Sequence, residues 1–137
     1  MENISLVIME KEKDTGFLSR ELGSYEVKYD TEYVSSIYAS REDENLYVNM
    51  YLTVPGEFED WKYNAILDNY DTGLYKDKAL LAEEDEDSYN PGWVIKFLFL
   101  ENDNEMEEKI NELLGIHVSE LERVLSQLKN IEDEYRD

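Results

Sequence analysis

Hydrophobic and polar residues alternate with a period of two over several short stretches of the first half of the chain. The alternation is clearest over residues 46–54, where Leu, Val and Met share one face and Tyr, Asn and Thr share the other. This period is typical of a β-strand with one buried face. Residues 4–10, 25–30 and 32–40 predict further strands. Residues 93–100 are apolar at nearly every position, which predicts a central strand covered on both faces.

A helical period replaces the alternation after Pro55-Gly56. Residues 57–70 predict a helix, because Tyr63, Ile66, Leu67 and Tyr70 recur at helical spacing. Residues 71–92 predict an exposed loop. Two apolar stripes at helical spacing follow, on either side of Gly115, which lies where a helix C-cap is expected. Ser119 then opens a capping-box pattern, so the C-terminal region predicts a helical hairpin.

Strands followed by helices favour an α+β fold. We expect a mainly antiparallel sheet of about five strands, with one helix after the fourth strand and a C-terminal helical hairpin packed on one face. The chain has 137 residues, a length that fits one domain spanning residues 1–137.

Charge adds a first indication of function. The chain has 34 Asp and Glu against 13 Lys and Arg, a net charge of −21. Such a surface repels nucleic acid and anionic membranes and attracts basic proteins. We therefore expect a basic protein partner, with no binding to nucleic acid or membrane. One uninterrupted acidic run stands out as a candidate contact for that partner: Glu83, Glu84, Asp85, Glu86 and Asp87.

Few residues suit catalysis. The chain has no Cys and a single His, His117, which excludes cysteine nucleophiles and histidine clusters that bind metal. There is no Gly-x-Ser-x-Gly elbow and no phosphate-binding loop. The sequence therefore predicts no enzymatic activity, catalytic residue, metal site or cofactor. The absence of signal-peptide and membrane-spanning patterns predicts a cytoplasmic protein. The composition, poor in Ala and Pro, suits a bacterial source.

Tyrosines supply a second candidate contact. Tyr47 and Tyr51 lie on the polar face of one predicted strand, and Tyr25 and Tyr29 alternate in another. If these strands are neighbours, the four rings form one face suited to a partner, because Tyr is enriched at interfaces. The alternative is ordinary packing between strands.

Residues 110–125 resemble the helix-turn-helix of bacterial repressors. Gly115 falls at the turn, and five apolar residues occupy the packing positions: Ile110, Leu114, Ile116, Leu121 and Val124. Asn111 stands at a position where that family usually has a small residue. The resemblance implies DNA binding, but Glu120 and Glu122 would place negative charge at the end that enters the groove. A helical hairpin packed on the sheet is therefore favoured.

These observations favour a non-enzymatic acidic module that binds proteins or regulates them. Three alternatives stay open: a nucleic-acid mimic or immunity-type inhibitor of a basic protein, a carboxylate- or metal-dependent enzyme, and DNA binding through the C-terminal helix pair.

Overall fold

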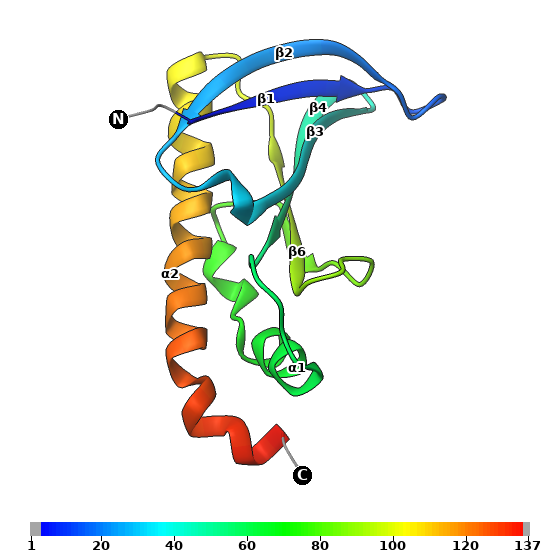
Figure 1. Cartoon of the computed structure of the whole chain (residues 1–137). Helices are drawn as coiled ribbons and strands as arrows, with labels where there is room; N and C mark the ends of the chain where they lie inside the picture. The colour runs from blue at the N-terminus through cyan, green and yellow to red at the C-terminus, as the bar shows by residue number, and fades with distance from the viewer. Residues whose placement is uncertain (1–3, 136–137) are drawn as a thin grey trace.

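The computed structural model describes residues 4–135. One long helix runs along one face of a six-stranded sheet (Figure 1). The elements follow the order β1 (Ile4–Lys11), β2 (Leu18–Val27), η1 (Thr31–Tyr33), β3 (Val34–Glu42), β4 (Asn45–Thr53), α1 (Asp60–Asn69), η2 (Thr72–Tyr75), β5 (Leu81–Glu84), β6 (Gly92–Leu98) and α2 (Asp103–Tyr135), where η marks a 3-10 turn. The predicted α+β class is confirmed, with α1 after the fourth strand.

The sheet is mixed and has six strands, in the order β2-β1-β3-β4-β6-β5. All neighbours are antiparallel except β1 and β3, which are parallel through the pairs Glu10 with Ala39 and Lys11 with Ser40. The unforeseen strand is β5, which lies in the region expected to be a loop. Its four residues, Leu81–Glu84, end in two carboxylates, so the apolar alternation that marks the other strands is missing.

The register of the sheet separates a helix-facing side from an open side. Val48, Met50 and Leu52 of β4 are buried beneath α2, and they pair with Phe97, Ile95 and Trp93 of β6. The intervening residues of both strands lie on the opposite face, where Lys96 is only partly buried and Leu98 is exposed. The expectation that residues 93–100 form a strand covered on both faces is therefore wrong.

The C-terminal region is one continuous helix, so the predicted hairpin is wrong. α2 begins beside Asn102, whose side-chain oxygen accepts a hydrogen bond from the Glu105 N–H group at 3.0 Å, and it passes through Gly115 without a turn. A Cβ atom at Gly115 would lie 2.9 Å from the hydroxyl oxygen of Tyr29. This glycine allows close packing within a helix and does not end one.

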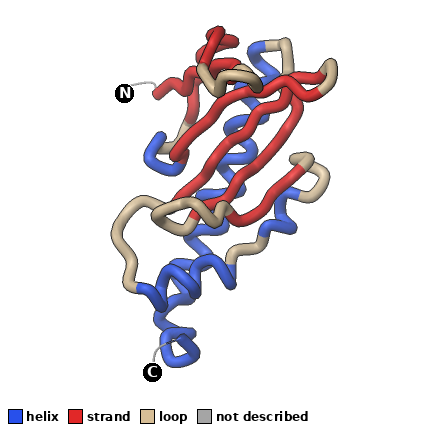
Figure 2. Tube along the Cα trace, turned by 90° about the vertical axis from the view of Figure 1, so that its right-hand side faces the viewer, coloured by secondary structure: helices blue, strands red, loops and turns tan. Residues whose placement is uncertain are grey.

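The two edges of the sheet differ. At the β2 edge, the Glu107 side chain accepts a hydrogen bond from the Glu26 N–H group at 2.7 Å. Asn111 accepts from the Lys28 N–H group at 2.8 Å and donates to the Glu26 carbonyl at 3.0 Å. Side chains of α2 thus occupy main-chain groups that a neighbouring strand would use. The opposite edge is β5, the short outer strand of the sheet in Figure 2.

Candidate partner-binding site

A hollow of about 680 Å³ lies beside β5 and the loop that joins it to β6. We call it the acidic hollow, and its lining is Tyr51, Tyr70, Thr72, Ala82, Glu83, Glu84, Asp85, Glu86, Asp87 and Val94. The loop is closed at its base, because the Asp85 N–H group donates to the Gly92 carbonyl at 2.8 Å. The Asp87 N–H group donates to the Asp85 carboxylate at 3.1 Å, which folds the acidic run back on itself. The fold therefore gathers the whole acidic run and one of the candidate tyrosines at a single place.

The carboxylates of the acidic run form no ion pairs within the described residues. Within residues 4–135, no Lys or Arg side chain forms an ion pair with any of its carboxylates. The charge of the hollow is thus uncompensated, and it favours a positively charged group arriving from outside.

Tyr51 contributes a neutral aromatic ring to the acidic hollow. Its hydroxyl group lies 3.3 Å from that of Tyr38, and the two rings are stacked with centroids 6.0 Å apart. The hydrogen bond with Tyr38, burial, and the nearby charges of Asp85 and Asp87 raise the pKa of Tyr51 to about 12. A neutral ring beside carboxylates is suited to the side chain of Lys or Arg.

The other three candidate tyrosines do not join this site. Tyr25 in β2 is 1% exposed, because its position pairs with Leu6 on the helix-facing side. Tyr29 packs against Gly115 of α2. Tyr47 lies on the open face, with the Lys96 ammonium nitrogen 4.9 Å from its ring centroid. Since β1 and β3 separate β2 from β4, the expectation of one face shared by all four rings is wrong.

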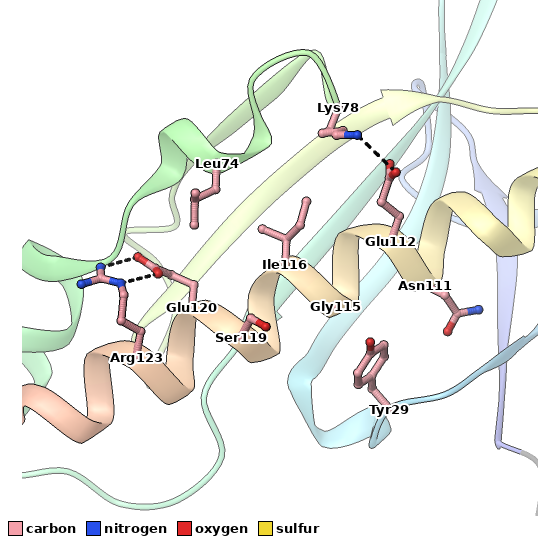
Figure 3. A pocket seen from close by; sticks show the side chains of 10 residues that line it. All are labelled: Tyr29, Leu74, Lys78, Asn111, Glu112, Gly115, Ile116, Ser119, Glu120 and Arg123. Atoms are coloured by element: carbon pink, nitrogen blue, oxygen red, sulfur yellow. Dashed lines mark hydrogen bonds and ion pairs between the residues drawn. The ribbon is translucent and has the colours of Figure 1, made fainter.

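Tyr29 lines a second hollow, of about 730 Å³, between η2 and α2. Figure 3 shows its two ends, where Lys78 contacts Glu112 at 3.4 Å and Arg123 contacts Glu120 at 2.6 Å. Leu74 and Ile116 lie between these pairs. Here each basic side chain already has an acidic partner, in contrast to the acidic hollow.

His117 belongs to a buried polar chain that the sequence did not indicate. Its Nε2 atom lies 2.8 Å from the Thr53 carbonyl oxygen, and its Nδ1 atom lies 2.8 Å from the Tyr70 hydroxyl oxygen. Because a carbonyl only accepts, Nε2 carries the proton and Nδ1 accepts from Tyr70. The Tyr75 hydroxyl group, 2.6 Å away, then donates to that of Tyr70.

These three hydrogen-bonded side chains join α2, the end of α1 and the end of β4 inside the core. His117 is 0% exposed and Tyr75 is 1% exposed. Burial lowers the pKa of His117 to about 4, despite the opposing hydrogen bond to Thr53. The imidazole is therefore neutral near pH 7. The turn expected after Gly115 does not form, and α2 continues through His117.

Glu120, placed by sequence in a capping box, instead joins α2 to the end of α1. It is 2% exposed and accepts hydrogen bonds from the Asp71 N–H group at 2.7 Å and from Arg123. Burial raises the pKa of the Glu120 carboxyl, but the hydrogen bonds from Arg123 and Asp71 outweigh it, so the pKa is lowered. The sequence signal for this contact is an acid that falls at helical spacing between His117 and Val124, on the stripe that α2 buries.

Structural findings bear on two of the alternative functions, DNA binding through a helix pair and metal-dependent catalysis. The helix-turn-helix does not form, because α2 runs unbroken across residues 110–125. Among residues 4–135, no group of three or more His, Cys, Asp or Glu side chains is arranged to hold a metal ion. In the same part of the chain, no helix has the length and apolar character of a membrane span.

Comparisons with known proteins define the family of this chain. No curated protein and no solved structure matches it. One family model does match, over residues 1–136, and it is described as a family of unknown function, DUF6762. The match covers nearly the whole chain, and the protein therefore belongs to the DUF6762 family.

Proposed function

We propose that this protein is a non-enzymatic module that binds or regulates a basic protein partner through the acidic hollow. The observation that carries the proposal is the grouping of Tyr51 with the whole acidic run, residues 83–87, around one hollow. Lys or Arg side chains of a partner would meet carboxylates that have no ion-pair partner within residues 4–135.

Long-range attraction supports the same partner chemistry. A net charge of −21 speeds the approach of a basic protein and discourages nucleic acid and anionic membranes. The acidic hollow then provides a defined binding site for the attracted partner. Exposed charges act over about 10 Å at 0.1 M salt and about 3 Å at 1 M, so binding is expected to weaken steeply as salt rises.

Affinity isolation with paired variants tests the proposal. The site variant replaces the acidic run by its neutral amides, with Glu83→Gln, Glu84→Gln, Asp85→Asn, Glu86→Gln and Asp87→Asn. The control variant removes the same charge from exposed acidic residues elsewhere, with Asp43→Asn, Glu108→Gln, Glu122→Gln, Asp133→Asn and Glu134→Gln. Both variants keep the side-chain sizes and share one net charge.

Wild-type protein and the control variant are expected to retain the same basic protein from a lysate at low salt and to release it at high salt. The site variant is expected to retain much less. Equal retention by the two variants would show that overall charge, and not the acidic hollow, attracts the partner. If wild-type protein retains no basic protein at low salt, the proposal is contradicted.

A further inference from the structure

The free edge of β5 forms part of the wall of the acidic hollow. Among the described residues, β5 is an outer strand, and it pairs with β6 on one side. The Asp85 N–H group bonds to the Gly92 carbonyl, and alternate residues of an antiparallel strand bond to the same neighbour. The main-chain groups of Leu81 and Glu83 therefore point towards β6. Those of Ala82 and Glu84 point towards the free edge.

Side chains of α2 bond to the C-terminal end of the β2 edge, and no such bond is formed at the β5 edge within residues 4–135. At the β2 edge, Glu107 and Asn111 of α2 bond to the main chain of Glu26 and Lys28. At the β5 edge, no side chain within residues 4–135 forms such a bond to Ala82 or Glu84. Edge strands that carry unpaired N–H and C=O groups are templates for another strand. The η2 turn packs against β5, but the main-chain groups of Ala82 and Glu84 on this edge form no bond of this kind and are available for strand addition.

We propose that an extended, basic segment of a partner protein pairs with β5 as an additional strand. This inference rests on the proposed function and specifies how the partner binds. Main-chain hydrogen bonds to Ala82 and Glu84 would supply affinity, and side chains on the two faces would supply specificity. Glu83 shares the open face with Val94 and Tyr51, whereas Glu84 shares the helix-facing side with Trp93. Lys or Arg on either face of the added strand meets a carboxylate.

Charge argues against a second copy of this chain as the added strand. Pairing of β5 with itself would bring Glu83 and Glu84 of one copy against those of the other. Like charges on opposed strands destabilise a sheet, and two chains of net charge −21 repel one another. The acidic edge thus selects a basic strand.

Hydrogen exchange at single amides tests strand addition directly. The probe is a heptapeptide of alternating Lys and Thr with blocked ends, and a Glu–Thr peptide of equal length is the control. At saturating Lys–Thr peptide, the amides of Ala82 and Glu84 are expected to exchange at least tenfold more slowly. The Glu83 amide, already directed towards β6, is expected to keep its rate. A bound peptide that leaves both edge amides unchanged would overturn the inference.

The variant Ala82→Pro separates main-chain pairing from charge. It removes a donor at the free edge, where proline is tolerated, and it leaves every carboxylate in place. We expect the dissociation constant of the Lys–Thr peptide to rise at least tenfold. Unchanged affinity would overturn strand addition while leaving electrostatic partner binding intact. If circular dichroism shows this variant to be unfolded, the hydrogen-exchange experiment on wild-type protein decides whether the peptide pairs with β5.

Two further results would also count against strand addition. If the Lys–Thr peptide does not bind at low salt, the basic-strand assignment is wrong, whatever protein is retained in affinity isolation. If the chain alone dimerises in sedimentation and this dimerisation protects Ala82 and Glu84, the occupant of the edge is a second copy.

Discussion

The Tyr70 hydroxyl oxygen lies 2.8 Å from Nδ1 of His117 and donates a hydrogen bond to it. This bond joins the segment after α1 to the middle of α2, while Nε2 of the same ring donates to the main chain at the end of β4. Three parts of the chain that are distant in sequence therefore meet at one imidazole, and its neutral form suits both bonds.

Acidification is expected to destabilise the protein through His117. The pKa of the ring is about 4 in the folded protein against an ordinary 6.5, so the unfolded chain takes up the proton first. The resulting stability is complete above pH 6.5 and declines as the pH falls to about 4, by roughly 3 kcal/mol in total. Urea unfolding between pH 7 and pH 4 measures this loss. Since many carboxylates also titrate, His117→Gln is the reference. An identical pH dependence in that variant would contradict the prediction.

Removing the Tyr70 hydroxyl group is expected to cost more stability than removing that of Tyr75. Tyr70→Phe leaves both the His117 acceptor and the Tyr75 donor without a partner, for a loss of about 2 kcal/mol. Tyr75→Phe removes a terminal donor and leaves the bond to His117 in place, for about 1 kcal/mol. Urea unfolding at pH 7 ranks the two variants. The reverse order would contradict the direction assigned to the hydrogen bonds.

Loss of Arg123 is expected to lower the free energy of unfolding more than loss of its ion-pair partner Glu120. Arg123→Met leaves a buried carboxylate with one fewer partner and should cost about 3 kcal/mol at pH 7. Glu120→Gln keeps an acceptor for the Asp71 N–H group and leaves a half-exposed guanidinium in contact with water, so about 1 kcal/mol is expected. Thermal unfolding of both variants gives the comparison, and equal losses would contradict it.

Gly115 and Tyr29 are expected to be coupled. Alanine in place of glycine inside a helix gains about 1 kcal/mol, but at this position its Cβ atom would lie 2.9 Å from the Tyr29 hydroxyl oxygen. Gly115→Ala alone should therefore gain little. In a Tyr29→Phe background the same change should gain close to the full amount. A double-mutant cycle by urea unfolding measures the coupling, and additive effects would contradict the close approach.

Much of the sheet was predictable from the sequence because side chains alternate along a half-buried strand. The stretch over residues 46–54 corresponds to β4, Asn45–Thr53, and the predicted helix over residues 57–70 corresponds to α1, Asp60–Asn69. The short strand β5 was missed, since its acidic residues carry no apolar signal. Its hydrogen bonds are formed with β6, across the loop that joins the two strands.

The candidate site was predictable in part. The acidic run and Tyr51 were both identified from the sequence, but nothing in it places residue 51 beside residues 83–87. The pairing of β4 with β6, and of β6 with β5, brings them together. β1 and β3 separate Tyr25 in β2 from the site, because spacing along a strand does not fix the order of strands in a sheet.

The sequence by itself determined the α+β class, the strong negative charge and the presence of one long acidic run. These depend on composition and on periodicity between neighbouring residues. The tertiary structure decided that Gly115 lies within one continuous helix, that His117 is buried and neutral, and that β5 leaves an open edge beside the acidic run. The first two depend on contacts between residues far apart in the chain, where packing outweighs local preference. The third depends on the order of the strands in the sheet.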